Sequence, residues 1–358
     1  MSRAVVVTLG EIMMRLATPG HARFQQAMPG MLQSTFAGAE ATVAAALAHW
    51  GGNASFVSAL PAHAIADACL VNLRQFGVDT RPVLRTPHGR LGLFFLEAGA
   101  NQRPHQVIYD REGASVAITP PEAYDWNAIF ADATWFHITG ITPALSENAA
   151  NVARTALREA SARGLQISLD VNFRSKLWNW SLPLTPVQLA ARTLQELMPM
   201  VTVFMGGRED AAALLDIQAD AGAKNPDVNV ARKLATRYPQ LTHIAMSLRE
   251  GVSANHSLWS GMLHAVATDT THFAPMHDGD VVPHEIPNIV DRLGAGDAFA
   301  AGIIYALSAP GSRDPAHAVR FAVAAGCLAH SVEGDFVHVS RAEVEALMQG
   351  DASSRVKR

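Results

Sequence analysis

The sequence predicts an α/β fold in which a doubly wound, mainly parallel sheet carries helices on both faces. The main reason is the order of patterns along the chain. Short apolar runs typical of buried strands alternate with helical patterns, and this order favours parallel strands joined by helical crossovers. A second reason is size and composition. The 358 residues, 49% of them hydrophobic and 17% charged, can bury the large core that such a sheet needs.

The first third of the chain contains two strand and two helix patterns. In chain order they are a strand at 5–9, a helix at 39–50, a strand at 54–60 and a helix at 65–76. Two segments depart from this alternation. Residues 12–36 are irregular with Pro-Gly turns, and residues 78–118 alternate strand-like runs, at 91–96 and 106–109, with turns and no expected helix.

The rest of the chain returns to alternation. The expected strands are 134–138, 166–170, 201–204 and 243–247, and the expected helices are 146–163, 185–197 and 228–237. Two further strand-like runs, 257–259 and 262–266, flank Ser260-Gly261, which we interpret as a hairpin turn. From Ala295 onward the pattern is mostly helical. Without internal repeats or long linkers, we expect one domain over 1–350 and a C-terminal tail at 351–358.

Composition excludes several function classes. A formal net charge of −4 argues against bulk binding to nucleic acid or membrane. The N-terminal apolar run is too short for a signal peptide, and no run is long enough to span a membrane, so we expect a cytoplasmic protein. Cys69 and Cys327 lie in apolar helical patterns and are interpreted as buried thiols. Neither a Walker A loop nor a Gly-x-Gly-x-x-Gly motif is present.

Residues 291–302, Asp-Arg-Leu-Gly-Ala-Gly-Asp-Ala-Phe-Ala-Ala-Gly, carry the most chemical information. Gly294 and Gly296 let backbone N–H groups converge, and the helix that follows adds unpaired N–H groups, so the stretch predicts an anion site. Asp297 beside an anion site suits a group that takes a proton from a hydroxyl attacking phosphorus. The alternative is a glycine turn with Asp297 as a helix cap.

This stretch resembles the signature of the ribokinase-like (PfkB) carbohydrate kinases, and the resemblance extends over nearly the whole chain. It implies that Gly294, Ala295 and Gly296 form the anion hole for the transferred phosphoryl group and that Asp297 is the catalytic base. It also implies ATP and Mg²⁺ as cofactors. In fold, it implies a ribokinase-like domain whose small β-sheet lid is built from insertions at about 12–36 and 87–118.

On the substrate side, Asp170 and Asn172 follow an expected parallel strand, where open α/β sheets bind ligands. Arginines on the probable lid strands and at strand ends suit a carboxylate, which a guanidinium binds through two hydrogen bonds. Surface salt bridges are the alternative for such arginines. The segments resemble the 2-keto-3-deoxygluconate kinase branch, which implies substrate contacts at Gly38, Phe94, Tyr109, Arg111 and Arg174.

On the nucleotide side, the resemblance implies contacts from residues after the strand at 243–247 and from a small residue on a later helix. They are Ser247, Arg249, Gly251 and Ala325. Small residues there could also serve close helix packing, and both interpretations stay open. The family positions its magnesium waters partly with an Asn-x-x-Glu motif. Here Gly207 replaces the asparagine, and the acid is Glu209 or Asp210, acting through water. Thr42 also replaces an asparagine of the branch.

The sequence therefore predicts an ATP-dependent kinase that phosphorylates the terminal hydroxyl of 2-keto-3-deoxygluconate or a close analogue. Two alternatives stay open: a kinase of the same family that acts on a neutral sugar or nucleoside, and a non-catalytic sugar-acid-binding paralogue. Substrate stereochemistry, a requirement for a monovalent cation and assembly into a homo-oligomer stay open as well.

Overall fold

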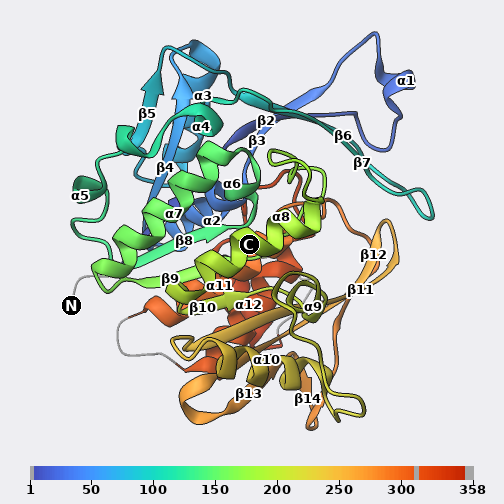
Figure 1. Ribbon diagram of the computed structural model, residues 1–358. Coiled ribbons are helices and arrows are strands. Elements are labelled where there is room, and N and C mark those ends of the chain that lie inside the picture. Colours follow the sequence, from blue (N-terminus) through green and yellow to red (C-terminus); the bar gives the residue numbers. More distant parts are fainter. Residues whose placement is uncertain (1–3, 310–313, 351–358) are drawn as a thin grey trace.

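The computed structural model describes residues 4–309 and 314–350, and within them ten strands join into one large sheet (Figure 1). The strands from β11 to β5 run parallel, and β12, β13 and β16 add antiparallel pairs. In spatial order they are β13 (Thr270–Ala274), β12 (His256–Ala265), β11 (His243–Ser253), β10 (Val203–Met205), β9 (Gln166–Asp170), β8 (Trp135–Thr139), β1 (Val5–Leu9), β4 (Asn53–Pro61) and β5 (Val83–Thr86), with β16 (His284–Ile286) beside β12. The predicted fold class is confirmed, and the predicted tail at 351–358 lies outside the described residues.

Helices cover both faces of this sheet, and Figure 1 shows α7, α8 and α10 in front of it with α11 and α12 behind. Alternate strand residues feed two separate apolar cores: in β1, Val6 joins one core while Val7 and Leu9 join the other. One face carries α2 (Ala39–His49), α3 (Ala64–Gln75), α11 (Ala295–Ser308), α12 (Pro315–Ala329) and α13 (Arg341–Met348); the other carries α7 (Glu147–Ala162), α8 (Pro186–Leu197), α9 (Arg208–Leu215) and α10 (Pro226–Arg237). Shorter elements are α1 (Phe24–Ala27), α4 (Ser115–Ile118), α5 (Trp126–Ile129), α6 (Ile141–Ala144), β14 (Met276–His277) and β15 (Asp280–Val281).

A separate four-stranded sheet extends away from the large one (Figure 1). Its order is β3 (Gln33–Ala37), β2 (Met13–Ala17), β6 (Gly92–Glu97) and β7 (Gln106–Asp110). We call it the small sheet. The expectation that 12–36 is irregular is wrong, because the segment begins with strand β2 and ends in strand β3. Five-residue strands whose pairing partners lie far along the chain leave only a weak local pattern. The inner face of the small sheet packs against Leu293, directly before Gly294.

The predicted hairpin turn at Ser260-Gly261 is also wrong. Both residues lie in the middle of β12, where Ser260 pairs with Leu248 and Gly261 with Ser247 of β11. Gly261 is needed for packing: a Cβ there would lie 2.8 Å from Phe299 and 2.9 Å from Val323. The chain turns instead at the tip of a long β11–β12 hairpin, which reaches the small sheet, since the Ala254 N–H donates to the Asn101 carbonyl over 2.8 Å.

Cys69 is buried, whereas Cys327 is only partly buried, and both are free thiols. None of the helices in the described parts of the chain has the length and apolar character that a membrane crossing requires.

Candidate active site

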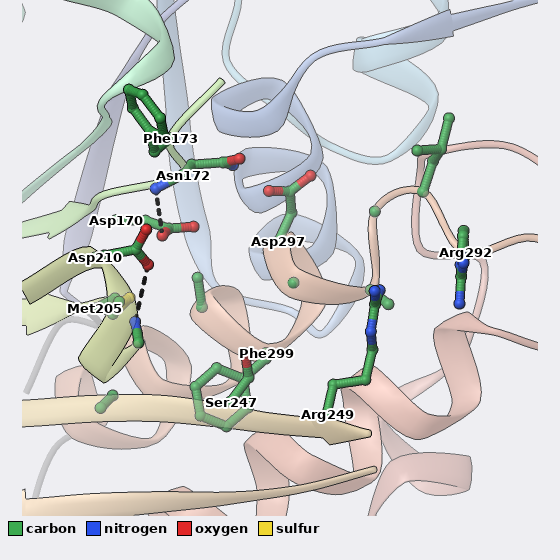
Figure 2. Close-up of a pocket in the computed structure, with 18 of the residues that line it drawn as sticks. Asp170, Asn172, Phe173, Met205, Asp210, Ser247, Arg249, Arg292, Asp297 and Phe299 are labelled. Carbon is green, nitrogen blue, oxygen red and sulfur yellow. Dashed lines mark hydrogen bonds between the residues drawn. The ribbon is translucent and has the colours of Figure 1, made fainter. Parts of the chain in front are cut away.

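A cavity of about 360 Å³ lies at the C-terminal ends of β9, β10 and β11, beside the start of α11 (Figure 2). Parallel α/β sheets bind ligands at this edge. Ten residues predicted from the sequence line it: Asp170, Asn172, Arg174, Asp210, Ser247, Arg249, Gly294, Ala295, Gly296 and Asp297. Sequence reasoning missed several others, among them Phe173, Met205, Trp259, Arg292 and Phe299.

The glycine loop begins α11 with a backbone that only glycine fits comfortably. Gly294 has φ 82°, and a Cβ there would lie 2.2 Å from the Asp335 carbonyl oxygen. Gly296 is different, because a Cβ there would meet no described atom within 4 Å. It faces the open cavity. The first N–H groups of a helix have no partner within the helix, so this end of α11 can bind an anion.

Asp297, in the first turn of α11, points toward Asn172 in Figure 2. Burial raises the pKa of Asp297 to about 8, and the negative charges of Asp170 and Asp335 add to the effect. Burial likewise raises the pKa of Asp170 to about 7, with a further contribution from Asp210. A carboxylate whose protonated form is favoured in this way is well suited to accept a proton from a hydroxyl.

The two acids proposed for the magnesium shell lie in different surroundings. The Asp210 carboxylate lines the cavity, and its Oδ2 accepts from the Gly207 N–H over 3.0 Å (Figure 2). Glu209 lies outside the cavity, where its side chain is 79% exposed and pairs with Arg208 at 3.0 Å. Burial raises the pKa of Asp210. Asp170 and Asp210 therefore supply hard oxygen donors. A divalent cation bound near them would reduce the repulsion between their two negative charges.

Within the described ranges no group of three or more histidines, cysteines, aspartates or glutamates is arranged to hold a metal ion. Mg²⁺ normally keeps several waters and binds one or two carboxylates together with substrate phosphates. The pair Asp170 and Asp210 fits that mode of binding.

Three arginines bring positive charge into the same cavity: Arg174, Arg249 and Arg292. None forms a salt bridge with any residue in the described part of the chain. Burial lowers the pKa of Arg249, and the nearby charge of Arg174 lowers it further. The same two causes, burial and the charge of Arg249, lower the pKa of Arg292. Figure 2 shows Arg249 and Arg292 on one side of Asp297, with Asp170 and Asp210 on the other. Arg292 donates from Nη2 to the Ser257 hydroxyl over 3.2 Å. Clustered cations without a carboxylate partner suit a polyphosphate or carboxylate.

Four of the predicted substrate contacts lie outside this cavity. Phe94 and Tyr109 face each other in the small sheet, with ring centroids 6.2 Å apart. The Arg111 guanidinium lies 5.3 Å from the centre of the Tyr109 ring and binds the buried Glu11 carboxylate, with Nε 2.8 Å from Oε2. At Gly38 a Cβ would lie 2.2 Å from the Glu11 carbonyl oxygen. Tyr109 and Arg111 instead line a separate, larger groove of about 1160 Å³.

Two predicted nucleotide contacts also lie outside the cavity. Gly251 is exposed on β11, and Ala325 is fully buried in α12. The neighbouring small residues allow close packing of helices: a Cβ on Gly302 of α11 would lie 2.5 Å from the Cα of Ala322 in α12. Close packing accounts for the small residues at Gly302 and Ala322, and the nucleotide contact at Ala325 stays a prediction.

A buried carboxylate near the cavity had no assigned role in the sequence analysis. Glu40, in the first turn of α2, accepts from the Thr139 N–H at 2.9 Å and from the hydroxyls of Thr139 and Thr142 at 2.8 and 2.7 Å. Burial raises its pKa. The nearby Thr42 hydroxyl is buried and has no hydrogen-bond partner in the described residues. Glu40 could have been singled out from the sequence, because it closely follows Gly38 in the segment that resembles the kinase branch.

Comparisons with known proteins identify the family and similar solved structures. The model of the pfkB family carbohydrate kinases matches residues 3–337. The chain is 32% identical to the 2-dehydro-3-deoxygalactonokinase of Haloferax volcanii, over 97% of both chains, and 28% identical to the 2-dehydro-3-deoxygluconokinase of Thermoproteus tenax, over 92% of this chain and 89% of the other. Among solved structures, the 2-dehydro-3-deoxygluconokinase of Thermotoga maritima superposes with a TM-score of 0.87 at 37% identity, covering 97% of this chain and 100% of that one.

Proposed function

The chain belongs to the pfkB family of carbohydrate kinases, and we propose that it is an ATP-dependent kinase of 2-keto-3-deoxy sugar acids. Within that class we propose 2-keto-3-deoxygluconate, also called 2-dehydro-3-deoxygluconate, or a close analogue as the acceptor. The observation that carries the proposal is one cavity in which the Asp297 carboxylate and the Gly294–Gly296 loop lie together with three arginines that form no salt bridge with a described residue.

In the proposed reaction, Asp297 accepts the proton of the terminal hydroxyl of the sugar acid. The hydroxyl oxygen forms a bond to the γ-phosphorus of ATP while the bond from that phosphorus to the bridging oxygen breaks, and ADP leaves. The backbone N–H groups of Gly294, Ala295 and Gly296 stabilise the negative charge on the transferred group. The raised pKa of Asp297 supports this role, since a stronger base takes the proton more readily.

We assign the three arginines of the cavity to different anionic groups of the two substrates. Arg249 and Arg292 lie beside the glycine loop and suit the phosphates of ATP. The charge of Arg174 opposes the rise in pKa of both Asp170 and Asp297, so Arg174 lies near the proposed base, and we assign it to the sugar-acid carboxylate. Asp170 and Asp210 would hold Mg²⁺ through water, and the ion would neutralise phosphate charge.

The test is ADP release measured with four acceptors: 2-keto-3-deoxygluconate, its galactonate epimer, fructose and a nucleoside. We expect both sugar acids to exceed the neutral acceptors in kcat/KM by about tenfold or more, because a guanidinium–carboxylate contact contributes about 1.5–3 kcal/mol. The ratio between the two epimers then identifies the preferred stereochemistry. A neutral sugar or nucleoside that matches or exceeds both acids would overturn the assignment of substrate class while leaving the kinase chemistry intact.

A further inference from the structure

A buried ionic cluster joins the small sheet to the start of α11. Arg15, on β2, donates from Nη1 to Oδ1 of Asp335 over 2.7 Å and from Nη2 to Oδ2 of Asp291 over 2.5 Å. The side chains of Arg15, Asp291 and Asp335 are 5%, 6% and 13% exposed. One guanidinium therefore bridges two buried carboxylates, in the fork geometry that arginine alone provides.

Both carboxylates belong to residues that contact the glycine loop. Asp291 accepts from the Leu293 N–H at 3.1 Å through Oδ1 and from the Gly334 N–H at 3.2 Å through Oδ2. On the other side, the Asp335 carbonyl oxygen lies 2.2 Å from the position of a Cβ on Gly294. The segment 291–296 therefore starts at one of the two acids, Asp291, and packs at Gly294 on the other, Asp335, and the side chains of both acids meet at Arg15.

The cluster depends on Arg15 for its charge balance. Two buried carboxylates repel each other, and burial raises the pKa of Asp335 to about 6 even though Arg15 opposes the shift. Without the guanidinium, these acids would separate, admit water or take up a proton. Separation of the two acids would move the loop, because Gly294 packs directly on the backbone of Asp335.

Arg15 also connects the small sheet to the 291–296 segment. It lies in β2, between β3 and β6, and the same face of the small sheet packs against Leu293. The small sheet therefore contacts the 291–296 segment twice, once through an apolar contact and once through the ion cluster. Movement of the sheet away from the cavity would break both contacts together.

We propose that Arg15 is a positioning residue for phosphoryl transfer, which holds the 291–296 segment in the conformation of the anion hole while the small sheet is seated on it. This inference rests on the proposed function, since that function gives the loop its part in the reaction. Seating of the small sheet then completes the anion hole, so the γ-phosphate of ATP is stabilised for transfer when the sheet is in place. Such coupling would limit loss of ATP to water.

The experiment compares Arg15→Ala with a matched control, Arg103→Ala. Arg103 also lies in a loop of the small sheet and pairs with a buried carboxylate, Glu97 at 2.9 Å, but it makes no contact with the glycine loop. At saturating ATP and sugar acid, we expect Arg15→Ala to lower kcat by about tenfold or more while KM for the sugar acid changes by less than about threefold. Arg103→Ala should stay within about threefold of the unaltered enzyme in both constants.

Rescue separates positioning from general damage. Guanidinium ion at tens of millimolar should restore the rate of Arg15→Ala by about threefold or more, because it can occupy the vacated space between the two carboxylates. It should not raise the rate of Arg103→Ala. Retention of kcat within threefold in Arg15→Ala, or a loss that guanidinium does not relieve in a folded variant, would overturn the proposal. If Arg15→Ala does not fold, Arg15→Lys, which keeps the charge but not the fork, is expected to show the kcat loss instead.

A substrate-free measurement keeps this proposal distinct from the proposed function. Amide hydrogen exchange over 291–298 should be faster in Arg15→Ala than in the unaltered protein, and unchanged in Arg103→Ala. If no sugar acid is phosphorylated, the proposed function fails, whereas faster exchange confined to this segment still supports the positioning role. Unchanged exchange in Arg15→Ala would contradict that role whatever the substrate.

Discussion

Arginines lie on both sides of this active site, and the two sides use them differently. In the cavity at the edge of the large sheet, Arg174, Arg249 and Arg292 form no salt bridge with a described residue. The charge of Arg174 helps to lower the pKa of Arg249, and the charge of Arg249 helps to lower the pKa of Arg292. In the small sheet and its loops the arginines other than Arg23 form salt bridges. The pairs are Arg15 with Asp291 and Asp335, Arg90 with Asp110, Arg103 with Glu97, and Arg111 with Glu11.

The contrast distinguishes charges that bind ligands from charges that hold the protein together. An unpaired cation in a cavity carries an electrostatic cost that an anionic ligand removes, so it gains most when the ligand arrives. A buried paired cation has already lost its water and gains little from a further anion. By this argument Arg174 is the better candidate for the carboxylate contact. Arg111, predicted for the same role, has its guanidinium engaged by Glu11.

The largest expected effect concerns the one cavity acid that the mechanism requires as a base. Asp297→Asn keeps the size of the side chain and removes its basicity, so kcat should fall by roughly 10²–10⁴-fold. Steady-state ADP release measures the fall, and calorimetric titration with ATP should show that nucleotide binding survives. A variant with near-normal turnover would show that the proton goes elsewhere.

The next effect tests the comparison directly, with one arginine from each side. Arg174→Ala should raise KM for the sugar acid by about 10- to 100-fold, which corresponds to about 1.5–3 kcal/mol, and should leave the melting temperature unchanged because no pair is broken. Arg111→Ala should destabilise the fold by about 3–5 kcal/mol, because it leaves the buried Glu11 carboxylate without its partner.

Thermal unfolding of both variants gives the result, and the double variant Glu11→Gln with Arg111→Met is the matched control. The double variant should recover part of the lost stability, since it removes both buried charges. If Arg111→Ala raises KM strongly and leaves the melting temperature unchanged, the comparison breaks, and Arg111 belongs with the ligand-binding arginines.

A smaller effect is expected from pH. The pKa of Asp297 is raised to about 8, and the residue acts as a base only when it is ionised, so kcat/KM for the sugar acid should increase with pH. The gain between pH 7 and pH 9 should be about tenfold for a single group of this pKa. Asp170, raised to about 7, makes the rise broader, because the two groups titrate as a pair. A profile that is flat above pH 6 would show that Asp297 is ionised in the free enzyme.

The smallest effect concerns the two positions that depart from the family motifs. Gly207→Asn together with Thr42→Asn should change kcat by less than about tenfold, or roughly 1.4 kcal/mol in barrier. At Gly207 the nearest atoms to a new Cβ are carboxylate oxygens of Glu209 at 3.3 Å and Asp210 at 3.6 Å, so a side chain can be accommodated. Water can also complete a magnesium shell in its absence. A gain of a hundredfold would show that the natural residues limit the enzyme.

Features that depend on residues close together in the chain could be predicted from the sequence. The alternation of strands and helices predicted the doubly wound sheet. Ten residues that the strand ends, the 291–302 stretch and the family resemblance had indicated line one cavity, and their roles stay predictions. The anion hole is local for a physical reason: neighbouring backbone N–H groups form it, and their direction depends on the glycines between them. Gly261, by contrast, looked like a turn because its packing partners, Phe299 and Val323, are remote in sequence.

The pairing of charges was decided only by the tertiary structure. Arg15 meets its two aspartates across 276 and 320 residues, and Arg111 meets Glu11 across 100. A sequence shows which charges exist, but an ion pair depends on which groups come within about 4 Å and on how much water remains around them. Those two quantities follow from the way the small sheet is seated against the large one. The sequence therefore determined the chemistry of the glycine loop and Asp297, while the fold determined which arginines remain unpaired in the cavity.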